Sequence, residues 1–345
     1  MNAQIALMLG QDGVTSGAIY ALLAISIILV FSVTRILLVP QGEFVTFSAL
    51  TMAAMQGGRP VRLGVLVLGL ALAALVMDVV ADRQRYRAWI WPKTSLALVA
   101  VGLVVVGLGL SVPFDRLGML AQIAFTLATV VPLGPLIYRV FFQPIAAAPS
   151  LVLLMVAIAV HVALIGGGLL IFGPEGARTE PFSDAVIELG PAMIASQTLW
   201  VIGVSALLTI ALGLFFEVSL WGKALRAAAF NRLGAELVGI SPEFAGRTSM
   251  TLAALIGAVS GIVVAPITTI YYDSGFLISL KGFVGAIIGA MSSFSVAALG
   301  ALLVGQTESF STFWASTYKE IIVFTLLLPV LLWRSLRQGS VEDDE

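Results

Sequence analysis

The chain has 345 residues, of which 59% are hydrophobic and 11% are charged, and its mean hydropathy is +1.06. An average soluble domain is about a quarter charged, so this composition excludes an ordinary soluble protein and indicates a polytopic protein of the lipid bilayer. The net charge of −1 argues against nucleic acid as a partner, and the lack of cysteine together with a single histidine excludes thiolate and multi-histidine metal centres.

Apolar segments recur along the whole chain and predict an all-α fold in one transmembrane domain, residues 1–345. A hydrocarbon core of about 30 Å requires about 20 apolar residues per helix, which makes the segments countable. They are 14–34, 37–56, 62–81, 95–111, 117–137, 150–172, 196–218, 250–271, 276–291, 295–311 and 319–334. The second, ninth and tenth are short or interrupted by Pro, Gly and Ser, so we expect eight to eleven transmembrane or re-entrant helical segments.

The second segment contains a predicted helix break. Pro40 removes a backbone donor and Gly42 weakens the helix, and membrane helices tolerate such breaks where the backbone is buried in protein or lines a cavity. Glu43 is costly against lipid, so it is expected to face the interior or an aqueous boundary. Gln41, Gly42 and Glu43 are therefore candidate pathway residues. The alternative is an interfacial Glu43 that caps the following helix.

Lys281 is a basic residue inside an apolar segment. Its long side chain is expected to reach the outer surface, with pairing to Glu43 or Asp273 as the alternative. The glycine- and serine-rich stretch around it, which includes Ser292 and Ser293, permits close helix contact or a re-entrant turn beside a pathway. Lys281, Ser292 and Ser293 are therefore further candidate pathway residues.

The polar stretch 219–250 lies between two long apolar segments. Lys223, Arg226, Arg232 and Arg247 recur in it at helical spacing, which predicts a short basic helix at the cytoplasmic membrane surface. Such a loop is suited to docking a partner outside the membrane. The alternative is that its basic residues serve membrane orientation alone.

The basic residues also predict the orientation of the chain. With the N-terminus outside, twelve of the 18 basic residues face the cytoplasm, in agreement with the positive-inside rule. The C-terminus and the loop 219–250 are then cytoplasmic. The loop 173–195 is then external, where it covers the pathway, meets an external protein or is a plain connector. Residues 335–345 form a polar tail with no assigned role.

No motif of a catalytic site is present in the sequence. The pair Gly222-Lys223 is followed by alanine and lacks the spacing of a phosphate-binding loop, and neither GxSxG nor HExxH occurs. We therefore expect no enzymatic activity in this chain. His161 stands alone in an apolar segment and is expected to hydrogen-bond a neighbouring helix, with a proton relay as the alternative.

Four stretches, in order, resemble the permease subunits of branched-chain amino-acid ABC transporters of the LivH/LivM type. The opening stretch, GAIYALLAISIILVFSVTRILLVPQGEFVTFSAL, carries the family's Gly-Glu pair, with Gln41 where histidine is usual. The other three are IYRVFFQPI, LRAAAFNRLGAELVGIS and LKGFVGAIIGAMSSFSVAALGALLVGQ. The resemblance covers 14–56 and 117–334, and residues 57–116 are interpreted as an inserted helical hairpin that the usual members lack.

The resemblance implies the membrane subunit of an ATP-driven importer in the bacterial inner membrane, moving a branched-chain amino acid or a related amide or carboxylate. The implied partners are a second permease of the same type, two cytoplasmic ATPases that hold ATP and Mg²⁺, and an external solute-binding protein, while this chain binds no cofactor. The ATPase-coupling residues it implies are Gly222, Arg226, Asn231, Arg232, Ala235, Gly239 and Ile240. The alternative is a secondary transporter or channel driven by an ion gradient, which would use Glu43, Lys281 and His161.

Overall fold

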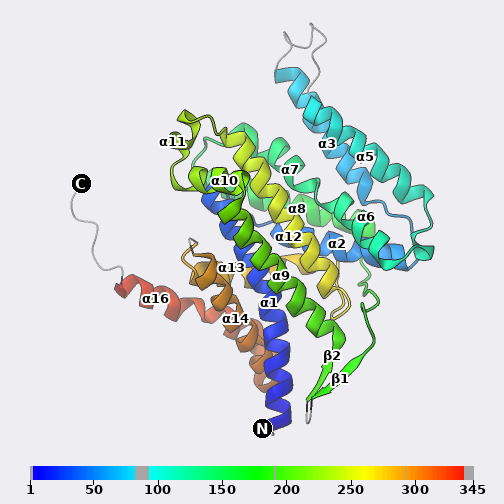
Figure 1. Cartoon of the computed structure of the whole chain (residues 1–345), viewed down its shortest axis with the longest axis vertical. Coiled ribbons are helices and arrows are strands. Elements are labelled where there is room, and N and C mark those ends of the chain that lie inside the picture. The colour runs from blue at the N-terminus through cyan, green and yellow to red at the C-terminus, as the bar shows by residue number, and fades with distance from the viewer. Residues whose placement is uncertain (1–2, 82–92, 190–191, 292, 338–345) are drawn as a thin grey trace.

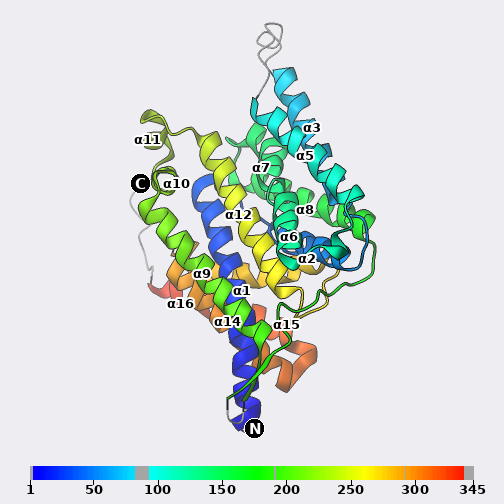
Figure 2. The same ribbon diagram turned by 45° about the vertical axis from the view of Figure 1, so that its right-hand side comes forward.

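The structure, a computed structural model, describes residues 3–81, 93–189, 192–291 and 293–337. Within these ranges the chain is mostly helical, and seven helical runs are long and apolar enough to cross a membrane. The N-terminus and a small β-hairpin lie at one end of the molecule, and the short helices α10 and α11 lie at the opposite end (Figure 1 and Figure 2). The predicted polytopic helical fold is confirmed.

Apolar runs of membrane-spanning length account for most of the helices, because a helix satisfies its own backbone hydrogen bonds in lipid. Before the β-hairpin the helices are α1 (Ala3–Thr34), α2 (Gln41–Gln56), α3 (Leu63–Ala81), α5 (Lys93–Ser111), η1 (Phe114–Arg116), α6 (Met119–Val130), α7 (Leu133–Ile137), η2 (Tyr138–Phe142), η3 (Gln143–Ile145) and α8 (Ser150–Phe172). After it they are α9 (Ser196–Val218), α10 (Leu220–Phe230), α11 (Arg232–Leu237), α12 (Pro242–Val264), α13 (Ser274–Ile288), α14 (Phe294–Ala315), η4 (Ser316–Tyr318), α15 (Lys319–Thr325) and α16 (Leu327–Arg337).

Helix α1 is central, and α9, α12, α13 and α14 all pack against it. Its middle is fully buried at Leu22 and Leu23. The contact with α14 is close, because a Cβ atom on Gly305 would collide with backbone atoms of Gly13 and Gly17. Small residues of this kind let membrane helices approach to backbone contact.

Two of the three segments predicted to be interrupted are short helices. Helices α2 and α13 have 16 and 15 residues, and at about 1.5 Å per residue neither crosses a hydrocarbon core of about 30 Å. The tenth segment, 295–311, is not interrupted, and this part of the prediction is wrong. It lies in the continuous helix α14, which Ser293 caps and which no proline interrupts.

Residues 173–195 contain an antiparallel β-hairpin that the sequence did not predict. Strand β1 (Val186–Leu189) pairs with β2 (Ala192–Ala195), and the pairing is closed by the Ser196 amide, which donates to the Ala185 carbonyl at 2.9 Å. The hairpin lies beside the N-terminal end of α1 (Figure 1). It is a small addition to an otherwise helical fold.

Within the range 57–116 the structure describes helices α3 and α5, and α3 packs along α5 and also contacts α6 and α7. Asp78 on α3 contacts both Ser95 on α5 and Arg139 on η2, which fastens the hairpin to the rest of the protein. Residues 82–92, between α3 and α5, lie outside the described residues. That the hairpin is an insertion stays a prediction. The tail 335–345 begins within α16, and residues 338–345 also lie outside the described ranges.

Candidate functional site

The two short helices α2 and α13 meet inside the protein, and we call their contact the half-helix junction. Gly42 and Gly275 lie in the first turns of the two helices, and their backbones touch. A Cβ atom on either glycine would collide with the carbonyl oxygen of the other. The junction therefore depends on glycine at both positions.

Glu43 and His161 pair across the helices α2 and α8 beside this junction. Nδ1 of His161 lies 2.7 Å from Oε1 of Glu43, and the side chains of both residues are at least 90% buried. The Phe276 ring of α13 packs on the imidazole, with centroids 4.8 Å apart. His161 thus meets a neighbouring helix through its pair with Glu43, and Glu43 is buried in the interior of the protein.

Gln41 points in another direction and ties α2 to α12. Its side chain is fully buried, and Nε2 donates to the Ala253 carbonyl at 3.1 Å. Within the described part of the chain, Oε1 of Gln41 and Oε2 of Glu43 are buried without hydrogen-bond partners. Buried polar atoms of this kind are usually satisfied by water or a ligand, so the junction is a polar position inside an apolar protein.

Lys281 is buried in a cluster of charges, and the prediction that it reaches the outer surface is wrong. Its Nζ lies 2.5 Å from Oε1 of Glu308 on α14 and 3.2 Å from Oε1 of Glu320 on α15. The Tyr20 hydroxyl donates to the other oxygen of Glu308 at 2.6 Å. The two carboxylates offset the cost of removing the Lys281 ammonium from water, so the ammonium is stable inside the protein. The alternative partner Glu43 is paired with His161 instead.

We expect Lys281→Met to destabilise the protein, because it leaves two carboxylates close together without their cation. Removing one partner of a buried pair typically costs about 3–5 kcal/mol. Thermal unfolding in detergent measures the loss, and Lys319→Met, at the start of α15, is the control. Restoring stability with Glu308→Gln in the Lys281→Met background would show that the cost is electrostatic. A melting temperature equal to that of the control would contradict the prediction.

The serine pair lies at the start of α14. Ser293 caps this helix, and its hydroxyl accepts from the Val296 amide at 3.4 Å. Ser292 lies outside the described residues. A capping role accounts for Ser293 without any contact to a pathway.

The loop 219–250 forms two short helices, where the sequence predicted one. Asn231 ends α10 in an extended conformation, and its Oδ1 accepts from the Gly234 amide at 2.9 Å to begin α11. Gly222 packs against the backbone at the end of α9. Gly239 adopts φ = +90°, which favours glycine and lets the Ile240 amide donate back to the Ala235 carbonyl at 2.9 Å.

Several large apolar side chains on these helices are exposed. We call the following set the α11 patch: Phe230 (93% exposed), Leu233 (69%), Leu237 (81%) and Val238 (75%). Ala235, on the other face of α11, is buried. Exposed apolar patches of this kind mark sites of contact with another protein or with the membrane.

The two arginines predicted for coupling lie on α10 and α11. Arg232 donates through Nη1 to the Ala146 carbonyl at 3.3 Å and so joins α11 to the segment after η3. Arg226 lines a cleft between α1, α9, α10 and α14. Phe230 of the α11 patch lines the same cleft.

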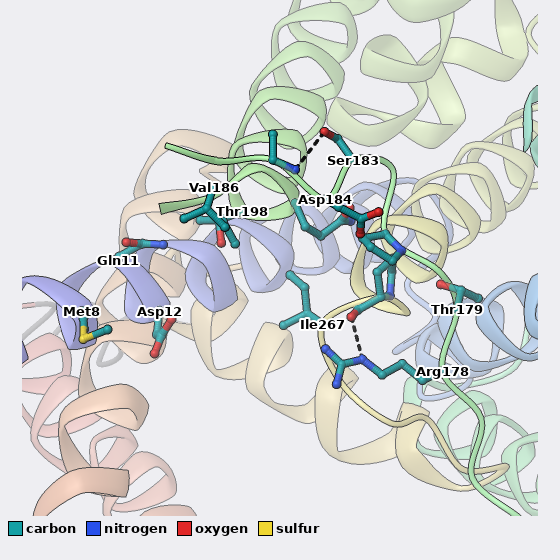
Figure 3. Close-up of a pocket in the computed structure, with 15 residues that line it drawn as sticks. Met8, Gln11, Asp12, Arg178, Thr179, Ser183, Asp184, Val186, Thr198 and Ile267 are labelled. Atoms are coloured by element: carbon teal, nitrogen blue, oxygen red, sulfur yellow. Dashed lines mark hydrogen bonds between the residues drawn. The ribbon is translucent and has the colours of Figure 1, made fainter. Parts of the chain in front are cut away.

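A pocket of about 560 Å³ lies at the opposite end of the protein, which Figure 3 shows in close-up. Residues from the start of α1, the loop 173–195, the start of α9 and the turn after α12 line it. Three of them are charged: Asp12, Arg178 and Asp184. Arg178 donates through Nε to the Pro266 carbonyl at 2.7 Å, which holds the loop against the turn (Figure 3). We call this the outer pocket.

Residues 94–331 match a protein family described as the permease component of branched-chain amino acid transport systems. The chain belongs to this family. Permease components of ABC transporters are non-catalytic transmembrane subunits, so the expectation that this permease is not an enzyme is confirmed.

The permease is similar to three proteins named as high-affinity branched-chain amino acid transport system permeases. It is 32% identical to LivH of Salmonella typhimurium over 136 residues, which are 39% of this chain and 44% of LivH. It is 29% identical to LivH of Escherichia coli K12 over 157 residues (45% and 48%) and to BraD of Pseudomonas aeruginosa over 252 residues (69% and 79%). The match thus spans less than half of the LivH proteins. No solved structure matches the permease.

Sequence reasoning missed two features of the permease that carried a detectable signal. Leu233 and Leu237 follow i, i+4 spacing in a polar loop, which predicts one apolar helix face. Glu308 and Glu320 are acids in the apolar C-terminal third of the chain, so they were available as partners of Lys281. The outer pocket had no such signal, because its residues come from four separate segments.

Proposed function

We propose that this permease is the membrane subunit of an ATP-driven importer that moves a branched-chain amino acid or a related small amide or carboxylate. The observation that carries the proposal is the exposed α11 patch, held on two short helices at the opposite end of the protein from the outer pocket. An apolar helix face of this kind fits a groove on a cytoplasmic ATPase. The names of the related permeases support the choice of solute class.

The connections of α10 and α11 explain how such docking would move the membrane helices. Helix α10 follows α9 after a single residue, Ser219, and α11 leads into α12 at Pro242. Helix α12 packs on α1 and on α2, which carries Gly42 and Glu43. Closure of an ATPase dimer would therefore displace α9 and α12 and act on the half-helix junction.

The remaining partners and the orientation follow from the same proposal. The outer pocket, with charges of both signs, receives a zwitterionic solute from an external binding protein, and a second permease completes the pathway. The two ATPase subunits hold ATP and Mg²⁺. The α11 end faces the cytoplasm of a bacterial cell and the N-terminus faces outside, as the positive-inside rule favours.

Charged substitutions in the α11 patch test the proposal. We expect Leu233→Asp with Leu237→Asp to abolish capture of the ATPase, because two carboxylates replace the apolar side chains that would enter its groove. Uptake should fall by at least about tenfold, which corresponds to about 1.4 kcal/mol. Ile187→Asp, an exposed apolar position in the β-hairpin at the other end, should keep ATPase capture unchanged. Co-purification from native membranes and uptake in vesicles are the measurements.

Two results would contradict this function. One is ATPase capture and uptake that both survive the double substitution in the α11 patch. The other is uptake that persists without any ATPase and collapses when an ionophore removes the ion gradient, which would favour the secondary transporter.

A further inference from the structure

A second cavity lies at the α11 end of the helix bundle. It is a cleft of about 720 Å³ between α1, α9, α10 and α14, and we call it the inner cleft. Most of its wall is apolar, and its lining includes Ile25, Leu29, Leu212, Phe216 and Ala298. None of the junction residues described above lines it, so it is distinct from the candidate pathway.

Charged residues gather at one end of the inner cleft. Arg35 follows the end of α1, Arg226 lies on α10 and Glu217 lies in the last turn of α9. Ile25 lies ten residues before Arg35, or about 15 Å along the helix. The cleft therefore has a basic mouth near the membrane boundary and an apolar interior that extends toward the membrane centre.

Both arginines lack a carboxylate partner among the described residues, even though Glu217 lines the same cleft. The guanidinium of Arg35 lies 5.9 Å from the ring centroid of Phe31, which places it over an apolar surface. Two unpaired guanidinium groups and one carboxylate leave the mouth with a net positive charge. An anion with more than one acceptor oxygen matches this arrangement.

The backbone at Arg35 supports a role for its side chain. Arg35 adopts φ = +61°, in the left-handed region that glycine occupies most easily. Its amide donates to the Phe31 carbonyl at 2.8 Å and so terminates α1. This backbone conformation sets the direction in which the Arg35 side chain leaves the end of α1.

We propose that the inner cleft binds one anionic phospholipid. Arg35 and Arg226 contact its phosphate, and an acyl chain lies along the apolar wall formed by α1, α9 and α14. Basic pockets between membrane helices recognise anionic headgroups, and an acyl chain matches a wall that has few polar groups. A free amino acid would leave this apolar length unfilled.

Lipid retention by the purified transporter complex tests the proposal. The complex is reconstituted in nanodiscs with equal amounts of phosphatidylglycerol and phosphatidylcholine, extracted in mild detergent, and its lipids are counted by native mass spectrometry. We expect one retained phosphatidylglycerol per chain. Arg35→Gln with Arg226→Gln should lower its retention at least fivefold, whereas Lys223→Gln, on α10 but outside the cleft, should not change it.

A matched pair of glycine substitutions tests the apolar part of the cleft. Gly213 lines the cleft and a Cβ atom there meets nothing within 4 Å, so Gly213→Leu fills the cavity without a backbone clash. Gly203, also on α9 and equally open, lies outside the cleft and provides the control Gly203→Leu. Only Gly213→Leu should lower phosphatidylglycerol retention.

Three results would overturn the proposal. The first is equal retention of the two lipids by the unaltered complex. The second is phosphatidylglycerol retention that survives the double arginine substitution. The third is a crosslink from Ala298→Cys, the only cysteine in that variant, to the second permease, since this would show that protein fills the cleft.

Discussion

Gly42→Ala is expected to prevent correct assembly of the half-helix junction and to abolish uptake. The added methyl group would collide with the Gly275 carbonyl oxygen, and both glycines lie in helical turns whose backbone has little freedom to move away. Overpacking against side chains costs about 1–3 kcal/mol, and a collision with a backbone carbonyl is less easily relieved. A large fall in melting temperature should therefore accompany the loss of uptake.

The control for this experiment is Gly166→Ala on α8, where a Cβ atom meets nothing within 4 Å. This substitution should raise helix stability slightly, because alanine has a higher helix propensity than glycine by about 1 kcal/mol. Gly275→Ala should reproduce the defect of Gly42→Ala. Thermal unfolding of the detergent-solubilised chain and uptake in vesicles measure both effects. Equal melting temperatures for Gly42→Ala and Gly166→Ala would show that the two backbones do not touch.

The sequence predicted those parts of the fold that depend on local patterning. Apolar runs located the long helices, and Pro40 and Gly42 located the break before α2, because length and backbone chemistry decide these features within one segment. The helical hairpin 57–116 followed for the same reason. The division of the loop 219–250 at Asn231 was missed, although an asparagine between two helical stretches is a typical cap.

Side-chain pairs between segments that lie far apart in the chain could not be predicted from the sequence. Glu43 and His161 are 118 residues apart, and only the packing of α8 beside α2 brings them together. The same holds for Lys281 and its two glutamates, whose contacts require α14 and α15 to turn back along α13. A single sequence states which residues need partners in a membrane, but the partner depends on which helices become neighbours.

Glu43→Gln is expected to lower uptake more than it lowers the amount of folded protein. Glutamine has nearly the same shape as glutamate, but it replaces the buried carboxylate that faces Nδ1 of His161 with a neutral amide. Hydrogen bonds to charged groups contribute about 1.5–3 kcal/mol, so we expect a moderate loss of stability. Expression, melting temperature and uptake are to be measured on the same preparations, with Asp78→Asn in the α3–α5 hairpin as the control for a carboxylate remote from the junction.

A double-mutant cycle with His161→Asn separates a structural role of the pair from a role in the pathway. Residues in direct contact show coupling free energies of about 0.5–3 kcal/mol, so the two substitutions should be non-additive in stability, whereas Glu43→Gln and Asp78→Asn should add. If the pair only fastens α8 to α2, the double variant should regain the uptake that either single variant lost. If Glu43 acts on the solute or on the opening of the pathway, uptake should stay low in every variant that lacks the carboxylate, including those that unfold at the normal temperature.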